Sequence, residues 1–282
     1  MAASRVAGAG GRRRAFREAG LLLAALLASA ALWLPGRALG EPVKVRHTEG
    51  LVHGFLALRT LDGALLASGD LIQTARSGRV ASRLIFRFKD GSRHEETTVF
   101  SQDGTFALIN HHLVQQGPSF PRPLDMRIDV AKRKVTVRYS DDDGEQQMES
   151  ENLESPSSLA NGLILTLLKN VSPGAAPLTV PMVAATPKPR VVDLEITASG
   201  EETFSTPGAT RKAMHYVVKV EIGGLAGLLA PLVGKQPPDS HVWILGGDAP
   251  AFVKSEQPLY AEGPVWRIEL ASPVWREARD AR

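Results

Sequence analysis

Residues 84–99 read LIFRFKDGSRHEETTV and contain the clearest β-hairpin pattern in the chain. In the first arm, Leu84, Phe86 and Phe88 alternate with other residues, so they share one face of a strand. Asp90-Gly91 follows, and this dipeptide suits a hairpin turn because both central residues of a type I′ turn need positive φ. The second arm is polar, so we expect it to be half solvated, as a strand at the edge of a sheet is.

The same pattern extends along most of the chain. Four further turn signals punctuate it, namely Asp62-Gly63, Ser77-Gly78, Asp103-Gly104 and Asp143-Gly144. We expect strands at 51–58, 65–75, 80–88, 93–101, 106–114, 125–130, 134–140 and 147–153, and again at 191–198, 212–222, 241–245, 252–255 and 266–270. Short strands joined by such turns indicate an antiparallel meander and a mainly β fold.

One helix is predicted at 156–171. Ser155 can cap its first turn, and Pro156 suits the first helical position. Its apolar stripe comprises Leu159, Leu163, Ile164, Leu167, Leu168 and Val171. Such a stripe on a helix normally faces the core of a protein.

A proline-rich segment follows at 173–189. Two interpretations stay open, because it could link two domains or form an edge strand, where proline is tolerated. We expect residues 41–282 to form a single β-rich domain in which this segment is a crossover.

The C-terminal part holds the candidate ligand-binding residues. A Gly- and Pro-containing segment at 223–234 places leucines at helical spacing, and aromatic residues gather after it. One interpretation makes Leu225, Leu228, Leu229 and Trp243 the lining of an apolar cleft under a mobile cover. The alternative is that 223–234 is a buried crossover and that the aromatic residues only close the core.

No motif for catalysis or metal binding is present. The chain has no cysteine, which excludes a disulfide framework and thiolate chemistry. His111 and His112 are adjacent, so on a strand they point to opposite faces and cannot share a metal. The acidic run at 141–145 fits a charged hairpin turn rather than an EF-hand loop. We therefore expect no catalytic residues, no metal and no cofactor.

The first forty residues have the organisation of a secretory signal peptide. Six arginines and one glutamate precede or surround an apolar run at 21–34, and Ala38-Leu39-Gly40 supplies a small-x-small cleavage site. Fourteen apolar residues are too few for a membrane span, which needs roughly 20. We expect cleavage near Gly40, no stable transmembrane anchor and a periplasmic or secreted product. Arg13-Arg14 also fits a twin-arginine signal, although ordinary secretion is preferred because of Glu18.

Charge excludes one class of partner. The chain carries a net charge of +3, but residues 41–282 hold 27 basic and 29 acidic residues and so carry −2. A domain without net positive charge is not typical of nucleic-acid binding.

Three sequence features together carry a resemblance to a known family. They are the export signal, the Ser-Pro-x-x-Leu-x-Asn-Gly helix start at 155–162, and the late strands with Val-Trp-Ile at 242–244 and Trp-Arg-Ile-Glu-Leu at 266–270. The chain resembles uncharacterised exported bacterial proteins whose fold is similar to the lipoprotein carriers LolA and LolB. The resemblance implies a strongly curved antiparallel sheet, an incomplete barrel, with one or two short helices in its mouth. The 173–189 segment departs from those carriers.

The resemblance implies a non-enzymatic periplasmic protein that binds or carries a lipid or other apolar ligand in the β-concavity. The alternative is a structural or assembly factor of the cell envelope, with an envelope protein as its partner and no small ligand. An exported hydrolase with an unrecognised site is the third hypothesis.

The leader generates a direct prediction. We expect the exported protein to begin at Glu41 and to be recovered without the membrane, because the apolar run is short and is followed by a cleavage site. Intact-mass measurement decides this, and a membrane-bound species that retains residues 21–34 would contradict it.

Overall fold

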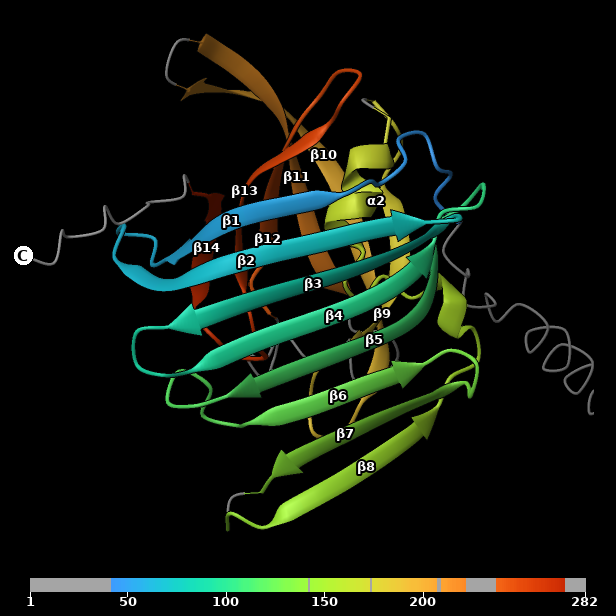
Figure 1. Cartoon of the computed structure of the whole chain (residues 1–282), viewed down its shortest axis with the longest axis vertical. Coiled ribbons are helices and arrows are strands. Elements are labelled where there is room, and N and C mark those ends of the chain that lie inside the picture. Colours follow the sequence, from blue (N-terminus) through green and yellow to red (C-terminus); the bar gives the residue numbers. More distant parts are fainter. Residues whose placement is uncertain (1–41, 142, 173, 207–208, 222–236, 272–282) are drawn as a thin grey trace, which may run out of the picture. The chain divides into compact units, whose positions relative to one another are not determined.

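In the residues that the structure describes, fourteen antiparallel strands form one curved sheet that does not close on itself (Figure 1). The computed structural model describes residues 42–141, 143–172, 174–206, 209–221 and 237–271. All of them belong to one compact unit, Gly40–Arg282. The predicted fold class, a mainly β incomplete barrel with short helices, is confirmed.

The first eight strands are β1 Val52–Arg59, β2 Leu65–Arg76, β3 Arg79–Phe88, β4 Arg93–Ser101, β5 Ala107–Gln116, β6 Leu124–Asp129, β7 Lys134–Ser140 and β8 Gln146–Asn152. Two short helices follow, the 3₁₀ turn η2 at Pro156–Ser158 and the α-helix α2 at Ile164–Asn170. The last six strands are β9 Leu178–Ala184, β10 Arg190–Thr206, β11 Ala209–Glu221, β12 Ser240–Leu245, β13 Ala251–Pro258 and β14 Val265–Leu270.

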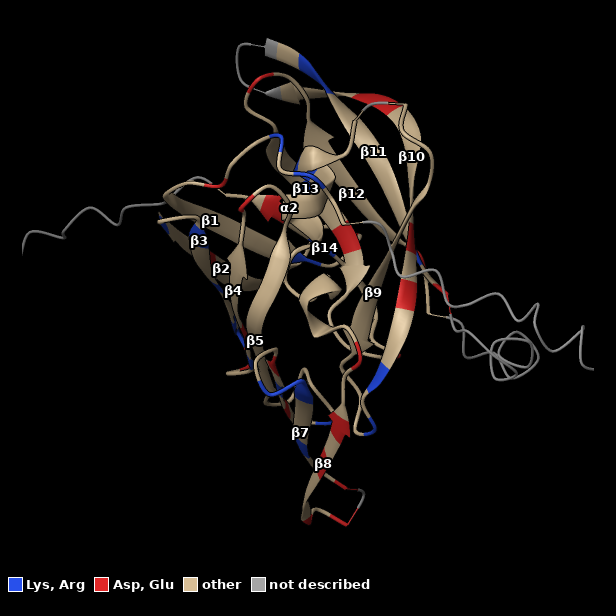
Figure 2. Cartoon of the chain, turned by 90° about the vertical axis from the view of Figure 1, so that its right-hand side faces the viewer, with Lys and Arg blue, Asp and Glu red and all other residues tan. Residues whose placement is uncertain are grey.

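The sheet consists of two meanders joined at one place. Strands β1 to β8 lie in chain order, and so do β9 to β14, while β1 pairs with β14 to connect the two sets. The edges of the sheet are therefore β8 and β9. The chain crosses from one edge to the other through residues 153–177, and we call the first part of this stretch, residues 153–170, the plug segment. Its helix α2 lies on the concave side, between the two halves of the sheet (Figures 1 and 2).

The second meander decides one open alternative and differs from the prediction at one strand. The proline-rich segment contains a strand, β9, at the edge of the sheet, which is one of the two alternatives considered. Strand β10 extends eight residues beyond its expected end at residue 198 because a bulge lets the pairing with β11 continue. The bulge lies between Ala198 and Gly200, and Gly200 adopts a φ of 124°, which favours glycine.

The predicted single helix at 156–171 is wrong. The structure has two short pieces separated by a turn at Asn161 and Gly162. Gly162 has a φ of 69°, which a right-handed helix cannot accommodate, and a Cβ there would lie 1.9 Å from Thr98 Oγ1. Ser155 makes no side-chain capping bond, although Pro156 does occupy the start of η2.

The apolar stripe of this segment nevertheless faces the core, as expected. Leu159, Leu163 and Leu167 are each at most 4% exposed. They belong to the larger of two core clusters, which joins the plug segment to β5, β6, β7 and β9 to β12. The smaller cluster joins β1, β2, β3 and β14 around Phe86, Phe88 and Trp266. The concave side is thus filled by side chains from both halves of the sheet.

Burial of the plug segment predicts its contribution to stability. We expect Leu167→Ala to lower the free energy of unfolding by about 2–5 kcal/mol, the usual cost of truncating a buried leucine. Leu51→Ala is the control, because Leu51 is 83% exposed and its truncation should change stability by less than about 0.5 kcal/mol. Equal effects in urea titrations would mean that the helix is not anchored in the core.

Candidate functional site

The concave face carries a row of polar side chains between its two apolar clusters. On β4, His94, Glu96 and Thr98 occupy alternate positions and therefore share one face of the strand. His94 and Thr98 are buried, and the Glu96 side chain is 24% exposed. The expected edge strand at 94–99 is wrong, because β4 lies inside the sheet between β3 and β5.

Strand β5 completes the row. In the β4–β5 register, His111 lies opposite Thr98 and Gln115 lies opposite His94. Thr98 Oγ1 lies 3.1 Å from His111 Nδ1, and Gln115 Nε2 lies 3.1 Å from His94 Nδ1. We call these four residues, together with Glu96, the polar layer. Gln115 also donates from Nε2 to the main-chain oxygen of Leu259, at 2.6 Å.

The polar layer lies beside members of both core clusters. Leu113, between the two β5 members of the layer, belongs to the larger cluster, whereas Phe86, opposite His94 on β3, belongs to the smaller. The plug segment touches the layer at Gly162, where an added Cβ would lie 2.9 Å from Glu96 Oε1. The layer is therefore one polar part of the interior, beside two apolar clusters.

Burial sets the protonation states in the layer. It raises the pKa of the Glu96 carboxyl to about 7 and lowers the pKa of the His111 imidazole to about 3. It also lowers the pKa of His94 to about 4. His111 Nδ1 and Glu96 Oε1 are 3.6 Å apart. Near neutral pH this contact joins a neutral imidazole to a carboxyl that is about half protonated, so it is not a full ion pair.

The two adjacent histidines point to opposite faces, as the sequence predicted. His111 is buried in the layer, whereas the His112 side chain is about one-third exposed. On the outer face, His112 Nε2 lies 2.9 Å from Asp125 Oδ1.

The layer offers hydrogen bonding rather than a recognisable catalytic relay. In a hydrolase triad, the nucleophile and the carboxylate contact different nitrogens of the histidine. Here Thr98 and Glu96 both approach Nδ1 of His111. Among the described residues, no group of three His, Cys, Asp or Glu side chains is placed to hold a metal ion.

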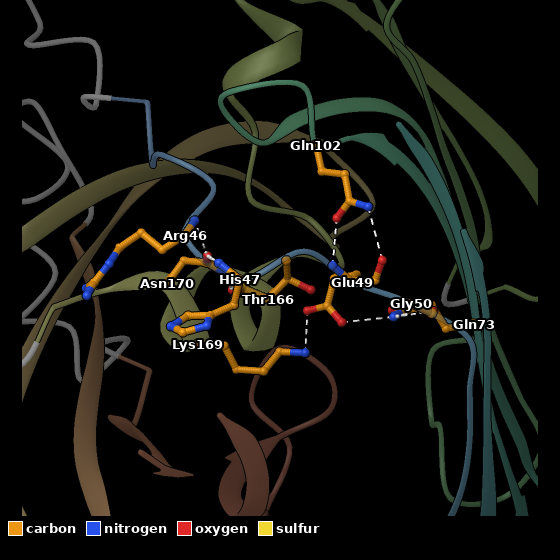
Figure 3. A network of polar contacts seen from close by, with 9 residues as sticks. All are labelled: Arg46, His47, Glu49, Gly50, Gln73, Gln102, Thr166, Lys169 and Asn170. Atoms are coloured by element: carbon orange, nitrogen blue, oxygen red, sulfur yellow. Dashed lines mark hydrogen bonds and ion pairs between the residues drawn. The ribbon is translucent and has the colours of Figure 1, made fainter. Parts of the chain in front are cut away.

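A second polar network holds the plug segment in place (Figure 3). The main-chain N–H groups of Arg46 and His47 both donate to Asn170 Oδ1, at 2.8 and 2.7 Å. Lys169 forms an ion pair with Glu49, whose side chain is 6% exposed. These contacts connect the end of α2 to the chain that precedes β1.

Glu49 is in turn fixed to the sheet. Gln73 Nε2 on β2 donates to Glu49 Oε2 at 2.9 Å. The Gln102 side chain accepts from the N–H of Glu49 at 2.7 Å and donates to its carbonyl at 3.0 Å (Figure 3). A buried carboxylate needs such partners, and here they hold α2 against β2 and the end of β4.

A small cavity lies beside the plug segment. It has a volume of about 120 Å³ and is lined mainly by apolar groups, including Val43, Phe106, Leu159, Leu163 and Val180. Drug-sized ligands generally need roughly 300–1,000 Å³, so this cavity is smaller than a ligand pocket.

Trp243 does not lie on the concave face. Its neighbours Val242 and Ile244 belong to the core cluster, and side chains alternate along a strand, so Trp243 faces outward. Its ring stacks on His215 with centroids 4.5 Å apart, and Lys254 Nζ lies 3.9 Å from its centroid.

Hydrogen bonds surround this indole ring. Trp243 Nε1 donates to Glu202 Oε2 at 2.8 Å, and His215 Nδ1 lies 3.0 Å from Glu202 Oε1. His215 Nε2 lies 2.9 Å from His241 Nδ1. The structure thus places Trp243 among polar side chains of the outer face. Leu225, Leu228 and Leu229, with the proposed cover 223–234, lie outside the described residues. A ligand-binding role for these three leucines and for Trp243 therefore stays a prediction.

Sequence reasoning missed the polar layer and the Glu49 network. The alternation of His94, Glu96 and Thr98 is visible in the sequence, but it was assigned to a solvated edge. Nothing in the sequence around Glu49 marks it as buried, because its partners Gln73, Gln102 and Lys169 come from three distant segments.

Comparison with known proteins does not assign the chain to a family. No protein-family model matches the sequence, and no curated protein matches it. One solved structure similar to this chain is a β-barrel-like protein of the domain of unknown function DUF1849 from Brucella abortus. The match has a TM-score of 0.48 and 11% identity, and covers 82% of this chain and 100% of that one. A specific likeness to LolA and LolB stays a prediction.

Within the described ranges, no helix is both long and apolar enough to cross a bilayer.

The polar layer predicts two opposing effects of pH on stability. The raised pKa of Glu96 stabilises the native state below its ordinary pKa of 4.5, and this contribution is lost as pH rises through about 7. The lowered pKa values of His94 and His111 stabilise it above 6.5, and these contributions are lost as pH falls toward 4 and 3.

We therefore expect Glu96→Gln to abolish the decline in stability between about pH 6.5 and pH 8. Between about pH 4.5 and pH 6.5, where the carboxyl opposes two imidazoles, the variant should gain stability more steeply with pH, and it should keep the decline in acid. Glu95→Gln is the matched control, because Glu95 is the neighbouring residue on the other face of β4 and pairs with Arg83. Urea titrations across this range provide the measurement. Parallel profiles for wild type and Glu96→Gln would show that Glu96 titrates normally in the folded protein.

Proposed function

We propose that this is a non-enzymatic, exported protein of the cell envelope that binds the acyl chain of a lipid, or a similar apolar ligand, on the concave face of its sheet. The observation that carries the proposal is the composition of that face. It is an apolar surface covered by a short, separate segment rather than by strands of the sheet. The leader supports export, and the periplasm is the proposed compartment.

The ligand would take the place of the plug segment. The existing cavity of about 120 Å³ is too small for an acyl chain, but the buried leucines of the plug segment line it and lie beside it. Displacement of Leu159, Leu163 and Leu167 would expose the apolar side chains of the sheet that pack against them. The polar layer lies against Gly162 of the plug segment, so that Glu96 could meet a polar headgroup there.

A second function is favoured by a specific observation. The concave side is filled, and the plug segment is held by the Glu49 network and by hydrogen bonds to β9. A permanently filled sheet suits an envelope structural or assembly factor that binds a protein and no small ligand.

Binding of an apolar fluorescent probe separates the two proposals. We expect N-phenylnaphthylamine to bind the mature protein, to be displaced by fatty acid, and to bind more tightly to Leu167→Ala, which enlarges the cavity. Leu51→Ala, on an exposed position, should bind like wild type.

Native mass spectrometry of protein purified from the cell envelope should also detect bound lipid. If neither wild type nor Leu167→Ala binds the probe and no lipid is found, the carrier proposal fails and the structural role remains.

A further inference from the structure

The two edges of the sheet differ in how they are covered. At β9, the Asn161 side chain bonds both main-chain groups of Val183, donating to its carbonyl and accepting from its N–H, each at 2.9 Å. The N–H of Ala160 donates to the carbonyl of Pro181 at 2.8 Å, and Pro181 has no N–H of its own on that side. The plug segment thus covers the β9 edge as a further strand would.

The β8 edge has no comparable cover. In the described part of the chain, β8 pairs with β7 alone, through seven successive residue pairs without a bulge. Hydrogen bonds at the two ends of this ladder, from Asp141 to Glu145 and from Leu153 to Arg133, set its phase. Because bonded pairs alternate in an antiparallel ladder, residues 146, 148, 150 and 152 turn their main-chain groups away from β7. A regular row of donors and acceptors therefore faces outward.

Strand β8 also contributes almost nothing to the core. Every residue except Ser150 is exposed, and Met148 is 62% exposed. Glu149 and Glu151 lie opposite Val137 and Val135, whose side chains are buried, yet both glutamates remain exposed. Hydrophobic burial therefore does not explain this strand.

The charges on β8 and on the turn before it have a single sign. The basic residues Lys134 and Arg138 of β7 lie opposite Asn152 and Met148, on the other face of the sheet from Glu149 and Glu151. Residues 139–168 contain seven acidic residues and no lysine or arginine, and acidic residues gather at β8 and the turn before it (Figure 2). Several acidic residues elsewhere on the sheet have basic partners, such as Glu95 with Arg83 and Glu269 with Arg59. Among the described residues, no basic side chain forms an ion pair with Glu145, Glu149 or Glu151.

We propose that the open edge of β8 binds an extended basic segment of a partner protein by strand addition. The partner's main chain would pair with residues 146–152, and alternate lysines or arginines would lie beside Glu149 and Glu151. A second copy of this chain is a poor occupant, because antiparallel self-pairing would place acidic residues opposite one another. This inference is independent of ligand binding on the concave face.

The competing explanation is that the acidic residues only prevent edge-to-edge aggregation, a known use of charge at sheet edges. The two explanations differ in what the edge does with a suitable strand. A protective edge rejects it, whereas a docking edge binds it in register.

The test uses the mature protein and a capped peptide of alternating lysine and valine, followed by NMR of the protein's amides. We expect binding that weakens as salt rises, with the largest shifts at residues 146, 148, 150 and 152. Met148→Pro removes one outward N–H and keeps every charge, so it should weaken binding about tenfold. Met148→Ala keeps the N–H and should bind like wild type.

Charge reversal supplies the second arm. Glu149→Lys with Glu151→Lys should abolish binding, whereas Asp62→Lys with Glu201→Lys, an equal charge change at exposed positions away from β8, should leave it within twofold of wild type. Melting temperatures confirm that each variant is folded. Absence of binding at low salt, equal binding by Met148→Pro and Met148→Ala, or dimerisation of wild type through β8 would each overturn the proposal.

Discussion

The pairing of β1 with β14 holds the two meanders in one sheet. Leu56 lies opposite Leu270 and Leu58 opposite Ile268, although these strands are separated by about two hundred residues of chain. Ala271 continues the ladder by donating to Phe55, and Arg59 Nε bonds Glu269 at 2.6 Å. Bringing such distant residues together costs entropy, and burial of both strands in the smaller core cluster offsets that cost. Without this ladder each meander would be a separate sheet with two edges, and the smaller core cluster, which draws residues from both meanders, would be divided.

The interior is organised by polarity as well as by packing. A row of polar side chains inside an apolar core is destabilising unless its members bond one another. Four members of the polar layer form such contacts in two pairs across β4 and β5. Glu96 stays partly accessible to solvent, and its carboxyl has a raised pKa of about 7. The turn at Gly162 rests against this row, so the plug segment and the layer constrain each other.

Much of the fold could be predicted from local sequence patterns. Alternating apolar residues and Asp-Gly turns marked thirteen of the strands, because each strand buries one face and each hairpin needs positive φ. The single long helix was wrong because Asn161 bonds a strand that lies more than twenty residues later. The sequence left open whether residues 173–189 form a strand, because proline is tolerated in a strand only at the edge of a sheet. Which strand lies at the edge depends on the order of all the strands, and this order is not visible in the local sequence.

The candidate site was less predictable for the same physical reason. A strand that alternates polar and other residues has the same sequence pattern whether its polar face meets water or the interior. For β4, the pairing with β3 and β5 is what places it inside the sheet, and this pairing is not visible in the sequence of the strand itself. Trp243 was expected in the interior because aromatic residues usually pack there. Its neighbours Val242 and Ile244 point into the core, so the alternation of side chains along β12 directs Trp243 to the outer face.

The long-range ladder also sets an order of events during synthesis. Strands β1 to β8 can pair with their chain neighbours as they emerge, but β1 lacks its second partner until residues 265–270 have been made. For that interval the incomplete protein exposes two strand edges and the apolar residues Leu56 and Leu58. Such a species is prone to aggregate, and its contacts of high sequence separation form slowly. A truncation that removes only the last strand would therefore leave the early meander in this aggregation-prone state permanently.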